Sequence, residues 1–159
     1  LRGEPIRAER DPEISADVPA FLPDDYVPDT GQRLDFYRRL AQASDEDRIR
    51  EIVAELEDRY GPLPDEARLL SDVMGHKILV REMGAIAYEL GPTRMVVSLG
   101  PDSPLDASRV MRLVQAKNSR WKLSPDMRLS YAFDDGEKRD RLVAARARLM
   151  EMRACRPAV

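Results

Sequence analysis

The stretch GPLPDEARLLSDVMGHKILVREMGAIAYEL, residues 61–90, decides the fold. Its opening Gly-Pro ends a preceding helix, because glycine favours a helix C-terminus and proline cannot continue the helix. Between Pro64 and about Met83, apolar residues spread around most of a helical circumference, which predicts the central and most buried helix. After Gly84 the apolar residues alternate with a period of two, which predicts a strand. The chain therefore combines helices with a sheet.

Two amphipathic helices are predicted upstream of this stretch. Asp29 or Thr30 caps a helix that ends at about Ala43, and Ser44 caps a second that reaches Gly61. The apolar face of the first helix is predicted to hold Leu34, Tyr37, Leu40 and Ala41. The apolar face of the second holds Ile49, Ile52, Val53, Leu56 and Tyr60.

Downstream, residues 86–90 and 95–99 alternate around a Gly-Pro-Thr turn, which predicts a β-hairpin. A helix over about 105–116, a strand over 127–133 and a last helix over about 137–154 follow. The predicted fold class is α+β, with helices packed on a small antiparallel sheet.

The first 29 residues are predicted to form an extended, proline-rich arm, with one short strand near 13–18. Residues 30–159 then form a single α+β domain. A chain of 159 residues is long enough for a core of its own, since a domain of this size buries roughly 68–70% of its unfolded surface.

Composition excludes several classes of function. The formal net charge of −3 gives the whole domain no basic footprint for nucleic acid. One cysteine excludes an internal disulfide and indicates a reducing cytoplasm. No apolar run has the length of a membrane span.

Motifs for catalysis are absent from the sequence. It contains no GxxxxGK[ST], GxGxxG, HExxH, CxxC or GxSxG pattern. The single histidine, His76, lies on the central helix and is interpreted as structural. Cys155 lies near a frayed end beside two arginines that would lower its pKa, and is interpreted as an incidental thiol. We therefore expect no catalytic residue, no metal and no cofactor.

One candidate interaction site lies on the second helix, opposite its apolar face. Glu51, Glu55 and Asp58 follow one another at i, i+4 and i+7, so their carboxylates form one exposed line. Like charges at this spacing destabilise a helix by about 0.2–0.5 kcal/mol per pair. A solvated face is the simplest interpretation, and a basic partner is the functional one.

A second candidate is a basic segment formed by Lys117, Arg120, Trp121 and Lys122. Cationic side chains around an aromatic ring can bind a nucleic-acid strand by charge and stacking. The alternative interpretation is a solvated loop anchored by the tryptophan. A nucleic-acid-contacting accessory domain is therefore the alternative function.

Several motifs together resemble one family, the carboxy-terminal domain of bacterial transcription-repair coupling factors (Mfd). The opening LRGEPI resembles the linker from the preceding translocase motor. The motifs that carry the resemblance are PEI (12–14), LPDDYVPD (22–29), RLDFYRRLA (33–41) and ELEDRYGPLP (55–64).

This resemblance implies a regulatory, non-enzymatic domain of an ATP-dependent DNA translocase. It implies docking on the UvrB-like amino-terminal region of the same protein, in competition with UvrA, so that the motor is restrained. RNA polymerase and DNA would be bound by other domains. Glu55 and Asp58 match the acidic positions that contact arginines of the UvrB-like region, whereas Glu51 is added by helical geometry. A structural tail that only stabilises the motor is a third hypothesis.

Overall fold

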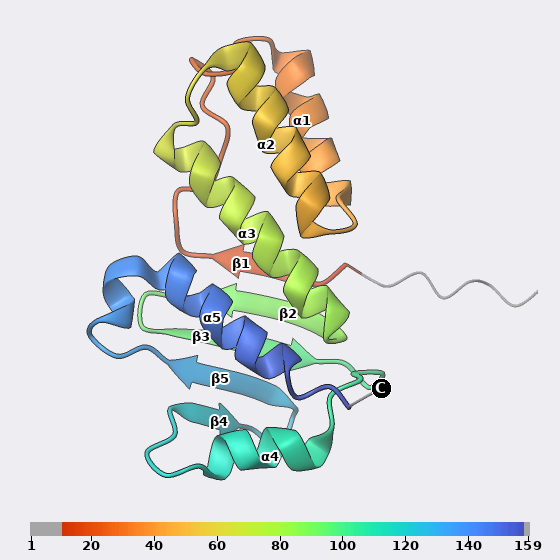
Figure 1. The fold of residues 1–159 in the computed structure, drawn as a ribbon, viewed down its shortest axis with the longest axis vertical. Helices are drawn as coiled ribbons and strands as arrows, with labels where there is room; N and C mark the ends of the chain where they lie inside the picture. The colour runs from red at the N-terminus through yellow and green to blue at the C-terminus, as the bar shows by residue number, and fades with distance from the viewer. Residues whose placement is uncertain (1–10, 158–159) are drawn as a thin grey trace, which may run out of the picture.

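The computed structural model describes residues 11–157. The predicted linker motif at residues 1–6 lies outside this range. Figure 1 shows a group of helices at one end of the molecule and a sheet at the other, with further helices packed against the sheet. The elements are β1 (Glu13–Ala16), α1 (Thr30–Gln42), α2 (Glu46–Tyr60), α3 (Asp65–Glu82), β2 (Ala85–Leu90), β3 (Arg94–Leu99), α4 (Ala107–Gln115), β4 (Trp121–Leu123), β5 (Arg128–Ala132), a 3-10 turn η1 (Glu137–Asp140) and α5 (Arg141–Arg153). The predicted α+β class is confirmed.

The five strands form one sheet in the order β1-β2-β3-β5-β4. Three of the strand pairs are antiparallel, as predicted. The pairing of β1 with β2 is parallel, however, with Ile14 opposite Tyr88, so the sheet is mixed. Three helices connect these two strands, and a long crossover of this kind is what a parallel pair requires.

Side-chain caps define the starts of three of the long helices. Asp29, one of the two predicted caps, accepts a hydrogen bond from the Gln32 amide at the start of α1. The cap of α2 is Asp45, which accepts from the Arg48 amide, and not the predicted Ser44. Aspartate and serine cap helices about equally well, so the sequence alone did not separate these neighbours.

Helix α3 lies between two hydrophobic clusters and contributes to both. The helical cluster contains buried residues of α1 and α2, together with Leu70 and Ile78 of α3. The sheet cluster contains buried residues of the strands and α5, together with Leu79 and Val80 of α3. Met74 packs against both clusters. The prediction that this is the most buried helix is confirmed.

The predicted arm is part of the domain over the residues that the structure describes. It contributes β1 to the sheet, and Leu22 and Val27 are buried in the helical cluster. The Leu22 amide donates to the Tyr37 hydroxyl of α1 at 2.7 Å. Lys77 of α3 is also buried, and its ammonium pairs with Asp11 at 3.3 Å. The described part of the arm therefore packs against both the sheet and the helices.

Two local predictions are wrong. Leu34 is 62% exposed, and the buried residues of α1 are Phe36 and Leu40. Residues 121–123 form the short strand β4, which was predicted to be a loop. Three residues are too few for an alternating pattern to be recognised, and β4 exists because it pairs with β5.

A matched pair of leucine substitutions tests this assignment of the core. Leu79→Ala should reduce the free energy of unfolding by about 2–5 kcal/mol, because it leaves a cavity between α3 and the sheet. Leu34→Ala should change it by no more than about 0.5 kcal/mol, because that side chain is exposed. Urea unfolding followed by circular dichroism measures both, and equal losses would contradict the assignment.

Candidate docking surface on helices α1 and α2

Helix α2 carries most of the acidic excess of the domain. Its sequence EDRIREIVAELEDRY holds six acidic and three basic residues, an excess as large as the net charge of −3 of the whole chain. Ile49, Ile52 and Leu56 are buried against the helical cluster, which directs the charged positions outward. The packing of α2 therefore determines which carboxylates face solvent.

Glu55 is held by two arginines within the domain. Both of its carboxylate oxygens accept from Arg39 of α1, at 2.6 and 3.1 Å, and Arg59 donates to Oε2 at 3.2 Å. The guanidinium groups of both arginines also lie over the ring of Phe36, at 5.0 and 5.5 Å from its centroid. The bidentate pair joins α1 to α2, so Glu55 has a structural partner that the sequence did not reveal.

This pairing changes the acidity of Glu55. Hydrogen bonds from Arg39 lower the pKa of the carboxyl group to about 2, against a partial desolvation that raises it. The carboxylate is thus ionised throughout the neutral range. Its four lone-pair positions are largely filled, since Oε2 accepts twice and Oε1 once.

The other two residues of the acidic line are more accessible. The side chain of Glu51 is 66% exposed and pairs with Arg48 at 3.1 Å within the same helix. Asp58 is exposed, and within residues 11–157 its carboxylate has no hydrogen bond or ion pair. The structure thus places all three predicted residues on α2, but only Glu51 and Asp58 present readily available carboxylates.

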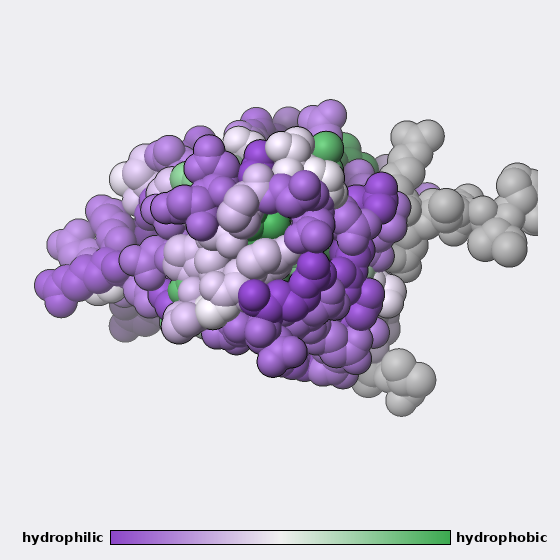
Figure 2. Space-filling model, turned by 90° about the horizontal axis from the view of Figure 1, so that it is seen from above, coloured by the Kyte–Doolittle hydropathy of each residue, from purple (hydrophilic) through white to green (hydrophobic). Residues whose placement is uncertain are grey.

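Figure 2 looks down on the molecule from above the view of Figure 1, at its helical end. Hydrophilic residues dominate this face, and the hydrophobic residues visible on it are scattered. A partner that docks here would meet charges rather than a continuous apolar patch. Interfaces of this type gain specificity and association rate from electrostatic complementarity.

The predicted basic segment has a different environment. Trp121 is only 4% exposed, and its indole N–H donates to Glu151 of α5 at 2.6 Å. The guanidinium of Arg120 donates to the main-chain oxygens of Ala132 and Phe133. The tryptophan ring therefore has no open face for a base to stack on, which contradicts the stacking alternative and fits the interpretation of Trp121 as an anchor. Lys117 and Lys122 are exposed and remain available to a partner.

His76 and Cys155 are both buried. The Nδ1 atom of His76 lies 3.0 Å from the Tyr88 hydroxyl, and burial lowers the pKa of the imidazole to about 4. This arrangement fits the structural role predicted for the histidine.

Burial raises the pKa of the Cys155 thiol, and Glu151 raises it further. The pKa lowering considered for two neighbouring arginines is therefore not found, and the interpretation as an incidental thiol stays a prediction.

No group of three or more His, Cys, Asp and Glu residues is arranged to hold a metal ion in the part of the chain that the structure describes. The helices within residues 11–157 are also too short or too polar to cross a membrane.

Comparison with solved structures shows which known fold this chain resembles. The fold matches a crystal structure of the C-terminal domain of a transcription-repair coupling factor, with a TM-score of 0.71 and 19% sequence identity. The match covers 91% of this chain and 94% of that chain. The class is thus an α+β domain with the architecture of that C-terminal domain.

Sequence comparisons identify the family. A protein-family model described as the TRCF domain matches residues 16–110, which is more than half of the chain. The transcription-repair-coupling factor of Myxococcus xanthus is 43% identical over 81% of this chain, and that of Escherichia coli is 31% identical over 88%. The chain belongs to the TRCF domain family. It spans 11% and 12% of the length of these two relatives.

The Glu55–Arg39 pair can be tested by titration. In the unmodified chain, Glu55 should titrate near pH 2, and in Arg39→Gln its pKa should rise toward the ordinary 4.5. Because the folded-state pKa is lowered, the pair stabilises the fold above about pH 4.5, and this contribution is lost as the pH falls toward about 2. Carbon-detected NMR of the carboxyl groups measures the shift. Arg48→Gln is the control and should leave Glu55 unchanged, so a response of equal size would exclude Arg39 as the cause.

Proposed function

We propose that this chain is a regulatory docking domain of a transcription-repair coupling factor. In this proposal its acidic line, Glu51, Glu55 and Asp58, pairs with basic residues of the UvrB-like region of the same protein. Docking there masks the surface that binds UvrA and restrains the ATP-driven DNA translocase. The domain itself carries out no catalytic step in this scheme.

Membership of the TRCF domain family supports the proposal, together with one observation on the surface. Glu51 and Asp58 lie on one side of α2 with exposed carboxylates. The helical end of the molecule is dominated by hydrophilic residues (Figure 2). Arginine side chains can bind such carboxylates through charge-assisted hydrogen bonds, with bidentate geometry that fixes the docking register. Close interfacial charge pairs can couple by about 1.5–7 kcal/mol.

The resemblance implies that Glu55 contacts the partner directly, but in this proposal its main role is within the domain. Since Arg39 and Arg59 already occupy most of its acceptor positions, an incoming arginine must share the carboxylate or displace a donor. Glu55 would then mainly orient Arg39 and Arg59 and keep the local charge balanced. Glu51 and Asp58 would provide the larger part of the attraction.

Release of the domain requires only a small shift in free energy. A closed state favoured by a few kcal/mol leaves about 0.1–10% of molecules open. A ligand that binds only the open form, such as UvrA, shifts this equilibrium by its difference in affinity between the two states. An interface built from partly exposed charges suits such a reversible contact.

Charge reversal of the two accessible carboxylates tests the proposal. In the complete coupling factor, Glu51→Arg with Asp58→Arg should raise the affinity for UvrA and increase the ATPase rate without polymerase. Neither side chain contributes to the buried core, so the domain should remain folded. We prefer this pair to Glu55→Arg, which would place a third guanidinium beside Arg39 and Arg59.

A matched control reverses two exposed charges in loops beside the sheet, Asp126→Arg with Asp135→Arg. This variant should leave UvrA binding unchanged. Equal UvrA affinity in the two double variants would contradict the docking proposal. Loss of thermal stability in the complete protein without a rise in ATPase rate would instead favour a purely structural tail.

A further inference from the structure

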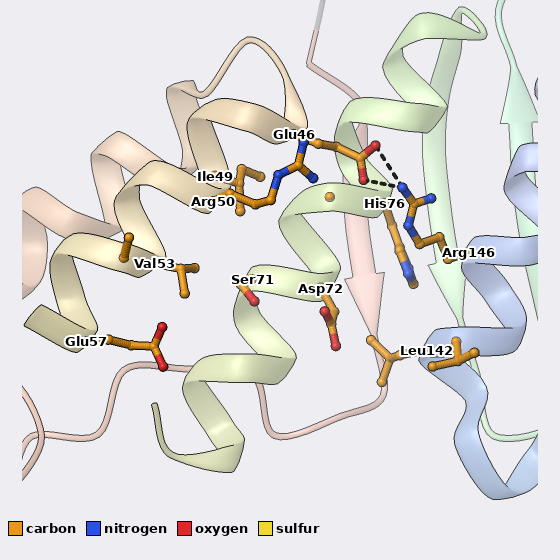
Figure 3. Close-up of a pocket in the computed structure, with 13 residues that line it drawn as sticks. Glu46, Ile49, Arg50, Val53, Glu57, Ser71, Asp72, His76, Leu142 and Arg146 are labelled. Carbon is orange, nitrogen blue, oxygen red and sulfur yellow. Dashed lines mark hydrogen bonds and ion pairs between the residues drawn. The ribbon is translucent and has the colours of Figure 1, made fainter. Parts of the chain in front are cut away.

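A groove of about 510 Å³ lies between α2, α3 and α5 (Figure 3). Its walls include Val53 of α2 and Leu142 and Val143 of α5, and its floor includes Asp72 and Gly75 of α3. Its volume falls in the range of about 300–1,000 Å³ that is usual for ligand sites. The groove therefore has room for several side chains of a partner.

An ion pair closes one end of the groove. Arg146 of α5 reaches across α3 to Glu46 of α2, with nitrogen–oxygen distances of 2.9 and 3.0 Å (Figure 3). Gly75 lies beneath, and a Cβ atom there would lie 3.5 Å from the Glu46 carboxylate. The charges of Glu46 and Arg146 at this end therefore neutralise each other.

The charges in the rest of the groove are not matched. Glu57 and Asp72 both line it, and within residues 11–157 neither carboxylate has a hydrogen bond or an ion pair. The other cation of the lining, Arg50, pairs with Asp47 on its own helix. Partial burial raises the pKa of Asp72, and the nearby carboxylate of Asp140 raises it further. The charges of Arg68 and Arg146 act in the opposite direction and lower this pKa. The lining still holds more carboxylates than cations, and neither Glu57 nor Asp72 has a direct ion-pair partner among the described residues.

The walls of the groove also expose apolar side chains near the carboxylates of Glu57 and Asp72. Val143 is 66% exposed on the first turn of α5, although neighbouring Leu142 is buried. Val53 lies on the opposite wall and is only partly buried. Val53 and Glu57 are four residues apart on α2, so an apolar group and a negative group are separated by about 6 Å along the helix axis.

We infer that this groove binds a basic amphipathic helix of a partner protein, with apolar side chains on Val53 and Val143 and a lysine or arginine between Glu57 and Asp72. A helix fits better than an extended peptide. The groove is bounded by three helices and offers no strand edge for main-chain pairing, whereas a helix satisfies its own main-chain hydrogen bonds. Apolar and cationic residues spaced i, i+4 on the guest would match the four-residue spacing of Val53 and Glu57.

The groove and the proposed docking surface lie on different faces of α2 and do not share a residue. Each can therefore be tested by substitutions that leave the residues of the other unchanged. This inference does not depend on the proposed function.

The test uses the chain itself and a designed probe. The probe is an alanine-rich helical peptide with leucine and arginine at i and i+4 on one face, and the control peptide has glutamate in place of arginine. In NMR titration, the arginine peptide should bind saturably and shift the amide resonances of Val53, Glu57, Asp72 and Val143. The glutamate peptide should bind at least ~10-fold more weakly, because a like charge replaces the attraction.

Variants of the chain complete the experiment. Glu57→Lys with Asp72→Lys should weaken binding of the arginine peptide by at least ~10-fold and reverse the preference between the two peptides. Glu51→Lys with Asp58→Lys, on the other face, should leave binding unchanged. The inference is overturned if the arginine peptide does not saturate, if its shifts map to the acidic line, or if both double variants bind it equally.

Discussion

Helix α3 belongs to two hydrophobic clusters at once, and the arrangement of the whole domain depends on this sharing. Leu70 and Ile78 face the helical cluster, whereas Leu79 and Val80 face the sheet cluster. A helix that is apolar around most of its circumference can be stable only when it is covered on several sides. The helices α1 and α2 therefore pack on one side of α3, and the sheet and α5 pack on another.

The surface features follow from this central position. Because α2 and α5 pack on different sides of α3, a groove is left between them, and the ion pair between Glu46 and Arg146 spans it at one end. His76 of α3 contacts the Tyr88 hydroxyl of β2, which fixes the helix against the sheet. The charged faces of α2 are held in place by the same core, so a partner meets them already oriented.

The features that could be predicted are those that depend only on residues close together in the sequence. Caps, Gly-Pro boundaries and apolar periodicity predicted α1, α2, α3 and the β2–β3 hairpin, because each depends on local geometry. The parallel pairing of β1 and the short strand β4 depend on distant strands, and no local pattern encodes them. Similarly, periodicity placed Leu34 inside, whereas Phe36 packs beneath the arginines that bind Glu55.

The candidate site shows the same division between local and distant information. Helical spacing correctly placed Glu51, Glu55 and Asp58 on one side of α2, because that relation is a property of a single helix. It could not show that Arg39, on another helix, pairs with Glu55 through both oxygens. The burial of Trp121 and Cys155 likewise depends on the tertiary packing of α5 against the sheet. Periodicity within a single element does not encode that packing.

The modest strength of exposed charge pairs has a consequence for the proposed docking. Individual exposed pairs contribute about 0.2–1 kcal/mol, because solvent and salt screen them. An isolated domain using Glu51 and Asp58 would then bind its target weakly. A covalent link changes this balance, since a tethered domain sees its target at an effective concentration in the millimolar range for a short flexible linker. Weak charge pairs thus suffice to hold a tethered domain closed, and they also permit its release when a competing partner binds the same surface.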